Sequence, residues 1–340
     1  VHVCESRTPG AGASQASAGV LAPYIEAESR SSLEALGVRS LALFDEFLSQ
    51  VASDAQQMVP YVRDGTLEVA ADDAGVARLE RSWQTLREEQ VDCELLTATE
   101  VREREPAMGP LAQAGLLIPT HGAVSARDLV NALARAAQAH DVTFANACTV
   151  RRVTPGREAK VATDGGVLRA EAVVIAAGAW GGCVPVEQGA VVPVRPVRGQ
   201  LLSLANVSTA PRRVVWAPDC YCVPWPDGHL LVGATVEDAG FNEQATLGGV
   251  RHLAAAVSRL FPGLEHAELE NVRVGLRPSS PDGLPIVGAS GQFHGLVYAT
   301  GHYRNGILLA PLTARVVADL IASGREDPML EVTAPARLGL

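Results

Sequence analysis

The sequence lacks the features that mark several common classes of protein. It contains no run of basic residues, and its 28 basic and 38 acidic residues give a net charge of −10, which argues against nucleic acid and anionic membranes as main partners. No apolar stretch approaches the roughly 20 residues that are needed to cross a bilayer, and we expect no signal peptide. We therefore expect no nucleic-acid partner, no membrane span and a cytoplasmic location.

Cysteine is sparse as well, with six residues at positions 4, 93, 148, 183, 220 and 222. Cys220 and Cys222 share one face of the alternating segment DCYCVPW, but there is no second pair and no nearby histidine. The pattern favours reduced thiols in a cytosolic protein, and we predict no metal site.

The first part of the chain has the pattern of a parallel α/β domain. Its 340 residues, 47% hydrophobic and 19% charged, suggest about two globular domains. Residues 1–5 alternate like a strand and 7–19 are small and flexible, which indicates a long loop. Apolar periodicity predicts helices over 31–52, 75–90 and 125–140, the last with Ser125 as N-cap. Strands are expected over 142–147 and 149–155, and the apolar run AVVIAAG at 172–178 predicts a buried strand of a parallel sheet.

The sequence pattern changes between residues 193 and 235, where it predicts short strands that alternate with turns. Asp227-Gly228 is a hairpin signal, so this region predicts an antiparallel sheet. A helix over 247–264 follows, then strands from residue 270 and a terminal helix over 308–322. We therefore predict an α/β protein in which an antiparallel substrate domain interrupts a parallel domain.

Glu5 is the first candidate for ligand binding, because it follows a strand. An acid at the end of a second dinucleotide-binding strand binds a ribose, and its G-x-G-x-x-G turn should lie about 20 residues earlier. The sequence begins with Val1, and GAGASQ at 10–15 is only a near match to such a turn. We therefore expect that the first strand and its glycine-rich turn are missing. The alternative for Glu5 is an ordinary solvated charge.

The turn GHYRNG at 301–306 is a stronger candidate. If a helix begins near Leu309, with Pro311 in its first turn, the N–H groups of residues 305–308 should point out of its end and attract an electron-rich group. Arg304 in this turn, Arg277 at a strand end and Tyr221 on the antiparallel sheet would form a carboxylate site if they converge. The alternative is that both arginines are surface charges.

Six segments follow one another in the order found in a known family. They are ESRTPGAGASQASAGVLAP, VVIAAGAWGG, VRPVRGQLLSL, YCVPWPDGHLLVGATVEDAGF, GLRPSSPDGLPIVG and GHYRNGILLAPLTA. Through them essentially the whole chain resembles the glycine-oxidase branch, of the thiamine pathway, in the FAD-dependent D-amino acid oxidase family. The family begins with about 30 residues, a strand, a G-x-G-x-x-G turn and a helix, that this sequence lacks, so the resemblance implies an N-terminally incomplete copy.

The resemblance implies a fold and a set of site residues. It implies a Rossmann-like FAD-binding domain over 1–60, 118–185 and 270–340, and an antiparallel-sheet substrate domain over 61–117 and 186–269. Arg277 would pair with the substrate carboxylate, with Tyr221 and Arg304 as its companions. FAD would be held non-covalently by Glu5, Ser6, Ala13, Ser14, Ala18, Gly19, Val20, Val150, Ala177, Gly178, His302, Tyr303, Arg304, Asn305, Gly306, Ile307 and Leu308.

The activity that the resemblance implies is oxidation of glycine, or of another small amino acid or amine, to the imine and glyoxylate, with reduction of O₂ to H₂O₂. A homo-oligomer is also implied. The alternatives are an oxidase or dehydrogenase of the same fold that acts on larger D-amino acids, sarcosine or proline, and a chain that no longer binds FAD and is not catalytic.

Overall fold

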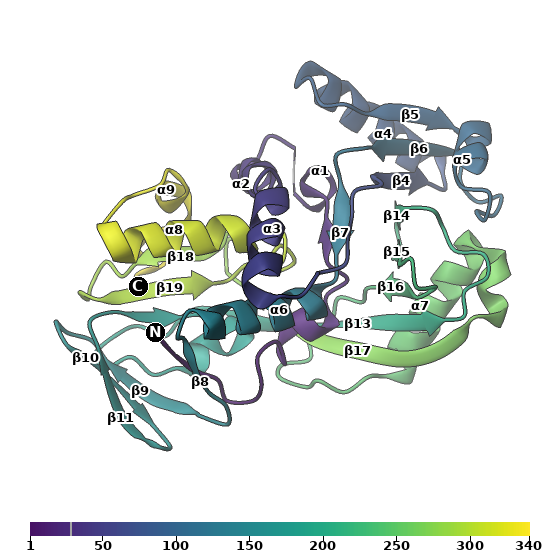
Figure 1. The fold of residues 1–340 in the computed structure, drawn as a ribbon. Coiled ribbons are helices and arrows are strands. Elements are labelled where there is room, and N and C mark those ends of the chain that lie inside the picture. Colours follow the sequence, from purple (N-terminus) through teal and green to yellow (C-terminus); the bar gives the residue numbers. More distant parts are fainter. Residues whose placement is uncertain (28) are drawn as a thin grey trace.

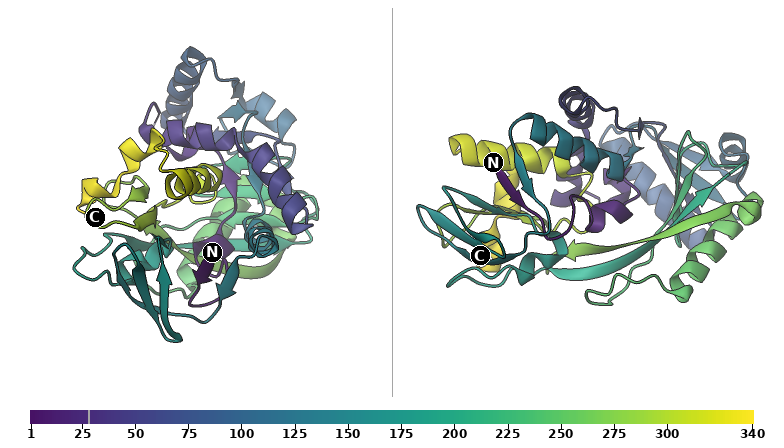
Figure 2. Two further views of the ribbon diagram at one scale, coloured as in Figure 1. Left: turned by 60° about the vertical axis from the view of Figure 1, so that its left-hand side comes forward. Right: turned by 60° about the horizontal axis from the view of Figure 1, so that its bottom comes forward.

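The computed structural model describes residues 1–27 and 29–340. The small parallel sheets, near which both chain ends lie, occupy one end of the molecule, and a large twisted sheet occupies the other (Figure 1). The right-hand view of Figure 2 shows the same separation from another side. None of the helices in these residues is long and apolar enough to cross a membrane.

The parallel strands form two small sheets. β1 (His2–Cys4) pairs with β8 (Thr143–Ala145), and β12 (Val173–Ile175) pairs with β19 (Leu296–Thr300), whose other neighbour is the antiparallel β18 (Ile286–Ala289). In residues 1–27 and 29–340, no ladder joins the two sheets. The parallel strand predicted from AVVIAAG is therefore present, but its burial was overestimated, because Val174 is 39% exposed.

Helices and a small antiparallel sheet flank these strands. α8 (Ala310–Ser323) and α9 (Met329–Thr333) pack on β18 through Leu312, Val316 and Met329. β9 (Val150–Thr154), β10 (Ala159–Thr163) and β11 (Gly166–Ala170) form the antiparallel sheet, with a turn after Thr163. The turn at 301–306 follows the end of β19 and precedes α8.

The helix predicted over 31–52 is two helices, α2 (Ser32–Leu41) and α3 (Phe44–Ala55). Leu36 of α2 packs in the cluster that contains α8, whereas Leu48 of α3 packs in the cluster that contains α6 (Ala126–Ala139). The chain bends because the two halves of its apolar stripe face different neighbours. Ser125 caps α6, as expected.

Short segments between the two ends of the molecule form a further small sheet. β2 (Val20–Leu21), β7 (Gly122–Val124) and β3 (Tyr61–Val62) are antiparallel, and β2 leads directly into α1 (Pro23–Glu26). This sheet carries the chain between the two ends of the molecule.

The large sheet has the strand order β17-β13-β16-β15-β14-β4-β6-β5. Its ladders are antiparallel except β14–β4. The strands are β4 (Thr66–Ala70), β5 (Glu94–Thr97), β6 (Ala114–Ile118), β13 (Arg195–Ala205), β14 (Val214–Trp216), β15 (Tyr221–Pro224), β16 (Leu230–Gly233) and β17 (Glu268–Ser279). The antiparallel sheet and the Asp227-Gly228 hairpin between β15 and β16 were thus predicted correctly.

Two helices pack on this sheet. α7 (Leu247–Leu260) buries Leu253 and Val257 against it, and α4 (Asp73–Glu88) buries Leu79 and Leu86. β13 and β17 are paired from Arg195↔Ser279 to Ala205↔Glu268, so the domain boundary expected at residue 270 falls inside a strand of the large sheet. That strand runs to the parallel end of the molecule and carries Arg277 there.

The helix α5 (Ala98–Arg104) is tied to the large sheet by a buried ion pair. Glu105 is fully buried, and its carboxylate accepts hydrogen bonds from Arg213 Nε and the Arg212 backbone N–H, each at 2.7 Å. By contrast, Glu94 and Arg104 form an exposed pair at 2.8 Å, with side chains 46% and 44% exposed.

We expect Glu105→Gln to lower the free energy of unfolding by roughly 3–5 kcal/mol, because it removes the fully buried partner of an ion pair and leaves the half-buried Arg213 without its counter-charge. Glu94→Gln is the control and should cost less than about 1 kcal/mol, since exposed pairs contribute little. Urea denaturation followed by tryptophan fluorescence measures both. Equal effects of the two variants would show that the buried pair does not hold this helix.

Candidate active site

A cavity of about 1910 Å³ lies between the two ends of the molecule. It is larger than the ~300–1,000 Å³ of a typical small-molecule site, so it can hold a dinucleotide together with a small substrate. Its wall includes Glu5 after β1, Ala177 after β12 and the turn after β19. Ligands of open α/β sheets bind at these carboxyl ends of strands.

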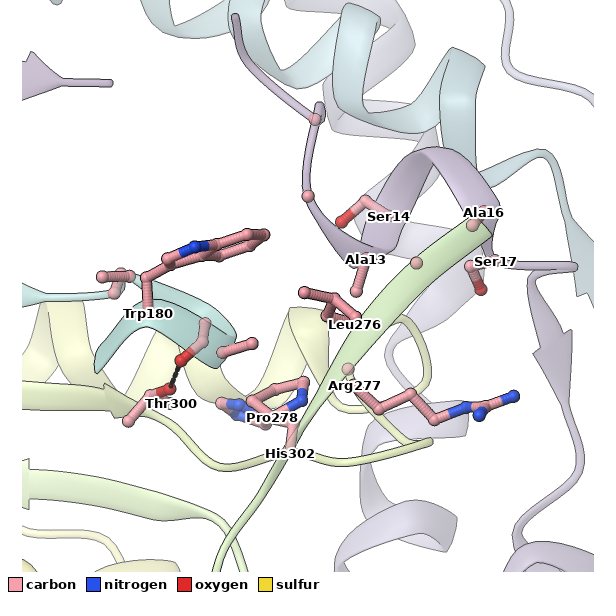
Figure 3. Close-up of a pocket in the computed structure, with 18 of the residues that line it drawn as sticks. Ala13, Ser14, Ala16, Ser17, Trp180, Leu276, Arg277, Pro278, Thr300 and His302 are labelled. Atoms are coloured by element: carbon pink, nitrogen blue, oxygen red, sulfur yellow. Dashed lines mark hydrogen bonds between the residues drawn. The ribbon is translucent and has the colours of Figure 1, made fainter. Parts of the chain in front are cut away.

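Most of the residues predicted from the sequence lie on the wall of this cavity. They are Glu5, Ser6, Ala13, Ser14, Ala18, Gly19, Val20, Val150, Ala177, Gly178, Tyr221, Arg277, His302, Tyr303, Arg304, Gly306 and Ile307. Figure 3 shows Trp180 on one side and Ala13 and Ser14 on the other, with Arg277 pointing away from Trp180. The structure thus gathers segments from both halves of the sequence around one space.

Asn305 and Leu308, the other two residues of the predicted set, are not on the cavity wall. Asn305 is only 4% exposed, and its backbone N–H donates to the His302 carbonyl oxygen at 2.9 Å. Leu308 is 2% exposed and packs with Leu21 and Phe44. Both face the protein interior because the turn must also anchor the start of α8.

The turn at 301–306 is fixed to the end of β17. The Tyr303 backbone N–H donates to the Pro278 carbonyl oxygen at 2.9 Å, and Tyr303 adopts a left-handed conformation with φ of 49°. That conformation is uncommon for a residue with a side chain and is found where the surrounding structure enforces it. The bond places Arg304 close to Arg277.

The backbone after this turn can receive an electron-rich group. α8 begins at Ala310 with a proline in its first turn, as predicted. Within the described part of the chain, the N–H groups of Gly306, Ile307 and Leu308 have no protein partner, but that of Asn305 is already bonded, so the expected set is smaller by one. Free N–H groups at the start of a helix attract negative charge.

His302 is a hydrogen-bonding residue. Its Nε2 lies 3.1 Å from Thr313 Oγ1, and burial lowers the pKa of its imidazole to about 4. The ring is therefore neutral near pH 7, and it anchors the turn to α8.

Arg277 is the central cation at the end of the cavity where we expect a substrate to bind. Its Nη1 donates to the Thr235 carbonyl oxygen at 3.0 Å. Among the described residues, no carboxylate lies within 4.0 Å of a side-chain nitrogen of Arg277 or Arg304. Burial lowers the pKa of Arg277, and the positive charge of Arg304 lowers it further. A carboxylate ligand would relieve both effects.

Tyr221, on β15, approaches the same point over the same face of the large sheet. Burial raises the pKa of its hydroxyl to about 12, so the group remains protonated and can donate a hydrogen bond. Trp216 stacks on its ring, with centroids 4.9 Å apart. The phenol therefore has a fixed direction.

Two glycines make this convergence possible. A Cβ at Gly199 would lie 2.4 Å from Arg277 Nη2, and one at Gly233 would lie 2.5 Å from the Tyr221 hydroxyl oxygen. Gly199 is on β13 and Gly233 is on the neighbouring β16. Each polar side chain thus lies across a glycine of the adjacent strand, and the two approach each other over the sheet.

A hydrogen-bond network holds the backbone that binds Arg277. Thr235 Oγ1 accepts a bond from the Gln200 N–H at 2.9 Å and donates to Glu237, which also accepts from Gln200 Nε2 at 2.7 Å. Arg198 Nη2 donates to the second oxygen of Glu237 at 2.5 Å. The Thr235 carbonyl oxygen is therefore a fixed acceptor for Arg277.

The other end of the cavity fits a dinucleotide. Loop residues 10–20 present mainly small side chains to the cavity, which leaves room for a flat ring. Glu5 is half-buried at the cavity edge; its Oε1 accepts the Arg7 N–H at 2.8 Å, and none of the described residues donates to Oε2. A carboxylate in this position can bind the hydroxyls of a ribose.

Among the residues of the wall that sequence reasoning missed are Arg7, Trp180 and Glu26. The Arg7 guanidinium lies 4.7 Å from the centre of a Trp180 ring and pairs with Glu243 at 3.0 Å. Trp180 directly follows the strand-end segment AAGA, and that position could have identified it. Glu26 ends a four-residue helix, which is too short to leave a periodic signal.

Comparison with known proteins agrees with this geometry. Residues 1–320 match the family DAO, described as FAD dependent oxidoreductase. Glycine oxidase of Geobacillus kaustophilus (strain HTA426) is 35% identical over 324 residues, which cover 94% of this chain and 86% of that protein. The bifunctional protein ThiO/ThiG of Nostoc sp. (strain PCC 7120) is 32% identical over 329 residues, which cover 94% of this chain and 49% of that protein.

The fold agrees as well. The crystal structure of glycine oxidase from Geobacillus kaustophilus matches with a TM-score of 0.94 at 34% identity, covering 99% of this chain and 92% of that one. The predicted mixed α/β two-domain fold is confirmed, and FAD, held without a covalent bond, is confirmed as the cofactor.

Glu5→Ala should weaken FAD binding by about 1–3 kcal/mol, the cost of leaving the ribose hydroxyls without their partner. Titration of the protein with FAD, followed by flavin fluorescence, measures the Kd. Glu171→Ala is the matched control, because Glu171 is exposed and lies outside the cavity wall. If both variants retain the parent Kd, Glu5 is an ordinary surface acid.

Gly199→Ala should displace the Arg277 guanidinium while the fold remains intact, since only a flexible side-chain tip must move. We expect acetate binding to weaken by roughly tenfold or more, because small misplacements of a binding group are costly. The shift of the flavin absorption spectrum on acetate addition reports this Kd. Gly248→Ala is the control, since a Cβ there meets nothing within 4 Å. Equal acetate binding in the two variants would argue against this placement of Arg277.

Proposed function

The chain belongs to the DAO family of FAD-dependent oxidoreductases, and we propose that it oxidatively deaminates glycine. The overall reaction converts glycine, O₂ and water into glyoxylate, ammonia and H₂O₂. The imine that precedes glyoxylate would supply thiazole synthesis for thiamine. The glycine oxidases and ThiO/ThiG proteins that the chain resembles support this choice among amino-acid oxidases.

The single observation that carries the proposal is the pairing of Arg277 with Tyr221 in a cavity where the described residues offer Arg277 no carboxylate. A guanidinium fork matches a carboxylate through two parallel hydrogen bonds, and the protonated phenol adds a third donor. A half-buried arginine needs such a partner because burial disfavours its charge. A substrate carboxylate meets that requirement.

The space near this pair suits a small substrate. Trp216 and Tyr221 stack on the cavity wall, which Ala234 and Val236 also line. Glycine has no side chain to accommodate there.

The cofactor end has residues that fit FAD. Glu5 would hold the ribose, the small residues of loop 10–20 would lie along the pyrophosphate and ring, and the N–H groups of Gly306 and Ile307 would face the ring. When bound, FAD supplies the two-electron acceptor that O₂ regenerates. The protein positions the Cα–H of the clamped substrate toward it, and water takes the proton that the ammonium loses.

Oxygen consumption with glycine tests the proposal. The protein purified with FAD should consume O₂ when glycine is added, and catalase should return half of it, because H₂O₂ is the product. Reduction of a quinone without O₂ uptake would instead identify a dehydrogenase. Uptake with D-alanine or sarcosine but not with glycine would replace the proposed substrate.

Arg277→Ala should lower kcat/KM for glycine by the equivalent of roughly 3–5 kcal/mol, the scale for removing one partner of a desolvated charge pair. Arg277→Lys should recover only part, since a point charge cannot form the fork. Steady-state kinetics with glycine and with methylamine, which has no carboxylate, separate binding from chemistry. If kcat/KM for glycine stays within a few-fold of the parent, the carboxylate is bound elsewhere and Arg304 becomes the first candidate.

A further inference from the structure

Glu26 has a carboxylate at the end of the cavity where the substrate is proposed to bind. The binding of the substrate carboxylate by Arg277 and Tyr221 does not involve it. Glu26 is the last residue of α1 and lies on the cavity wall. Its Oε2 atom is buried and has no hydrogen-bond partner among the described residues. An unpartnered buried oxygen is costly, so a ligand that donates to it would be stabilised there.

The groups that face Glu26 define the ligand. Burial raises the pKa of Glu26, while the charges of Arg304 and Arg277 lower it. Glu26 in turn raises the pKa of Tyr221. The three side chains Arg277, Arg304 and Tyr221 are therefore within electrostatic reach, but no nitrogen of either arginine lies within 4.0 Å of a described carboxylate. The space between them can accept a group that has both signs of charge.

We propose that Glu26 binds the ammonium group of the substrate while Arg277 and Tyr221 bind its carboxylate, an inference that rests on the proposed function. A carboxylic acid without an amine would satisfy the arginines and leave Glu26 unpaired. An amino acid satisfies both ends at once. Glu26 is thus the residue that selects amino acids over the corresponding hydroxy acids.

The surroundings of α1 support a binding role. Its position is set by other residues: Pro23 is buried, and Tyr24 stacks on His121 with ring centroids 5.5 Å apart. The Glu26 carboxylate forms no hydrogen bond within the described chain that would hold the helix. Substituting it should therefore change the cavity more than the fold.

The test compares glycine with glycolate, which replaces the amine by a hydroxyl. Glycolate binding is titrated through the flavin spectrum, and the glycine Kd is taken from the rate of flavin reduction against concentration in the absence of O₂. For Glu26→Gln we expect the glycine Kd to rise on the order of 10- to 100-fold, the scale for losing a charged partner. Glycolate should bind as in the parent or more tightly.

Glu34→Gln is the matched control: Glu34 is buried on α2 and lies outside the cavity wall, so both Kd values should be unchanged. Glu26→Asp keeps the charge and should give a glycine Kd between those of the parent and Glu26→Gln. It replaces Glu26→Gln in the test if Glu26→Gln no longer binds FAD or melts at a lower temperature than the parent. The inference would be overturned if the Kd values of glycine and glycolate rise equally, or if neither changes. Either result is expected if Glu26 only pairs with Arg304. A parent protein that does not oxidise glycine would instead refute the proposed function.

Discussion

The positive charge of Arg277 is the constraint on which the rest of the site depends. Burial disfavours this charge, and among the described residues only carbonyl oxygens accept its hydrogen bonds, the nearer being that of Thr235 at 3.0 Å. The long pairing of β17 with β13 extends the large sheet toward the parallel end of the molecule and holds the arginine there. The sheet therefore serves as a rigid support that presents one charged group to the cofactor cavity.

Glycine positions and hydrogen bonds convert that support into a shaped site. Gly199 and Gly233 leave room for Arg277 and Tyr221 to lie over neighbouring strands, and the Gln200–Glu237 network fixes the carbonyl that holds the arginine. The Tyr303–Pro278 backbone bond then ties the turn before α8 to the same strand. Residues of the turn before α8 are thus connected to Arg277 through one backbone hydrogen bond and the Arg277–Pro278 peptide bond.

The sequence was most informative where local chemistry decides the structure. Pro311 in the first turn of α8, Ser125 at the start of α6 and the Asp227-Gly228 hairpin were predicted because each acts on the backbone within a few residues of itself. Tertiary packing decided the rest: the bend between α2 and α3 depends on which neighbour each half contacts, and the burial of Asn305 and Leu308 depends on the anchoring of the turn. Glu26 was missed because its role arises only when α1 is placed beside residues some 200 or more positions away.

A crystal structure of the FAD-loaded protein with glycolate tests the central claim most directly, because it shows where the arginine finds its partner. The account predicts both carboxylate oxygens within about 3 Å of the Arg277 guanidinium, with a hydrogen bond from the Tyr221 hydroxyl. A carboxylate bound to Arg304 alone, with Arg277 still donating only to carbonyl oxygens, would contradict it.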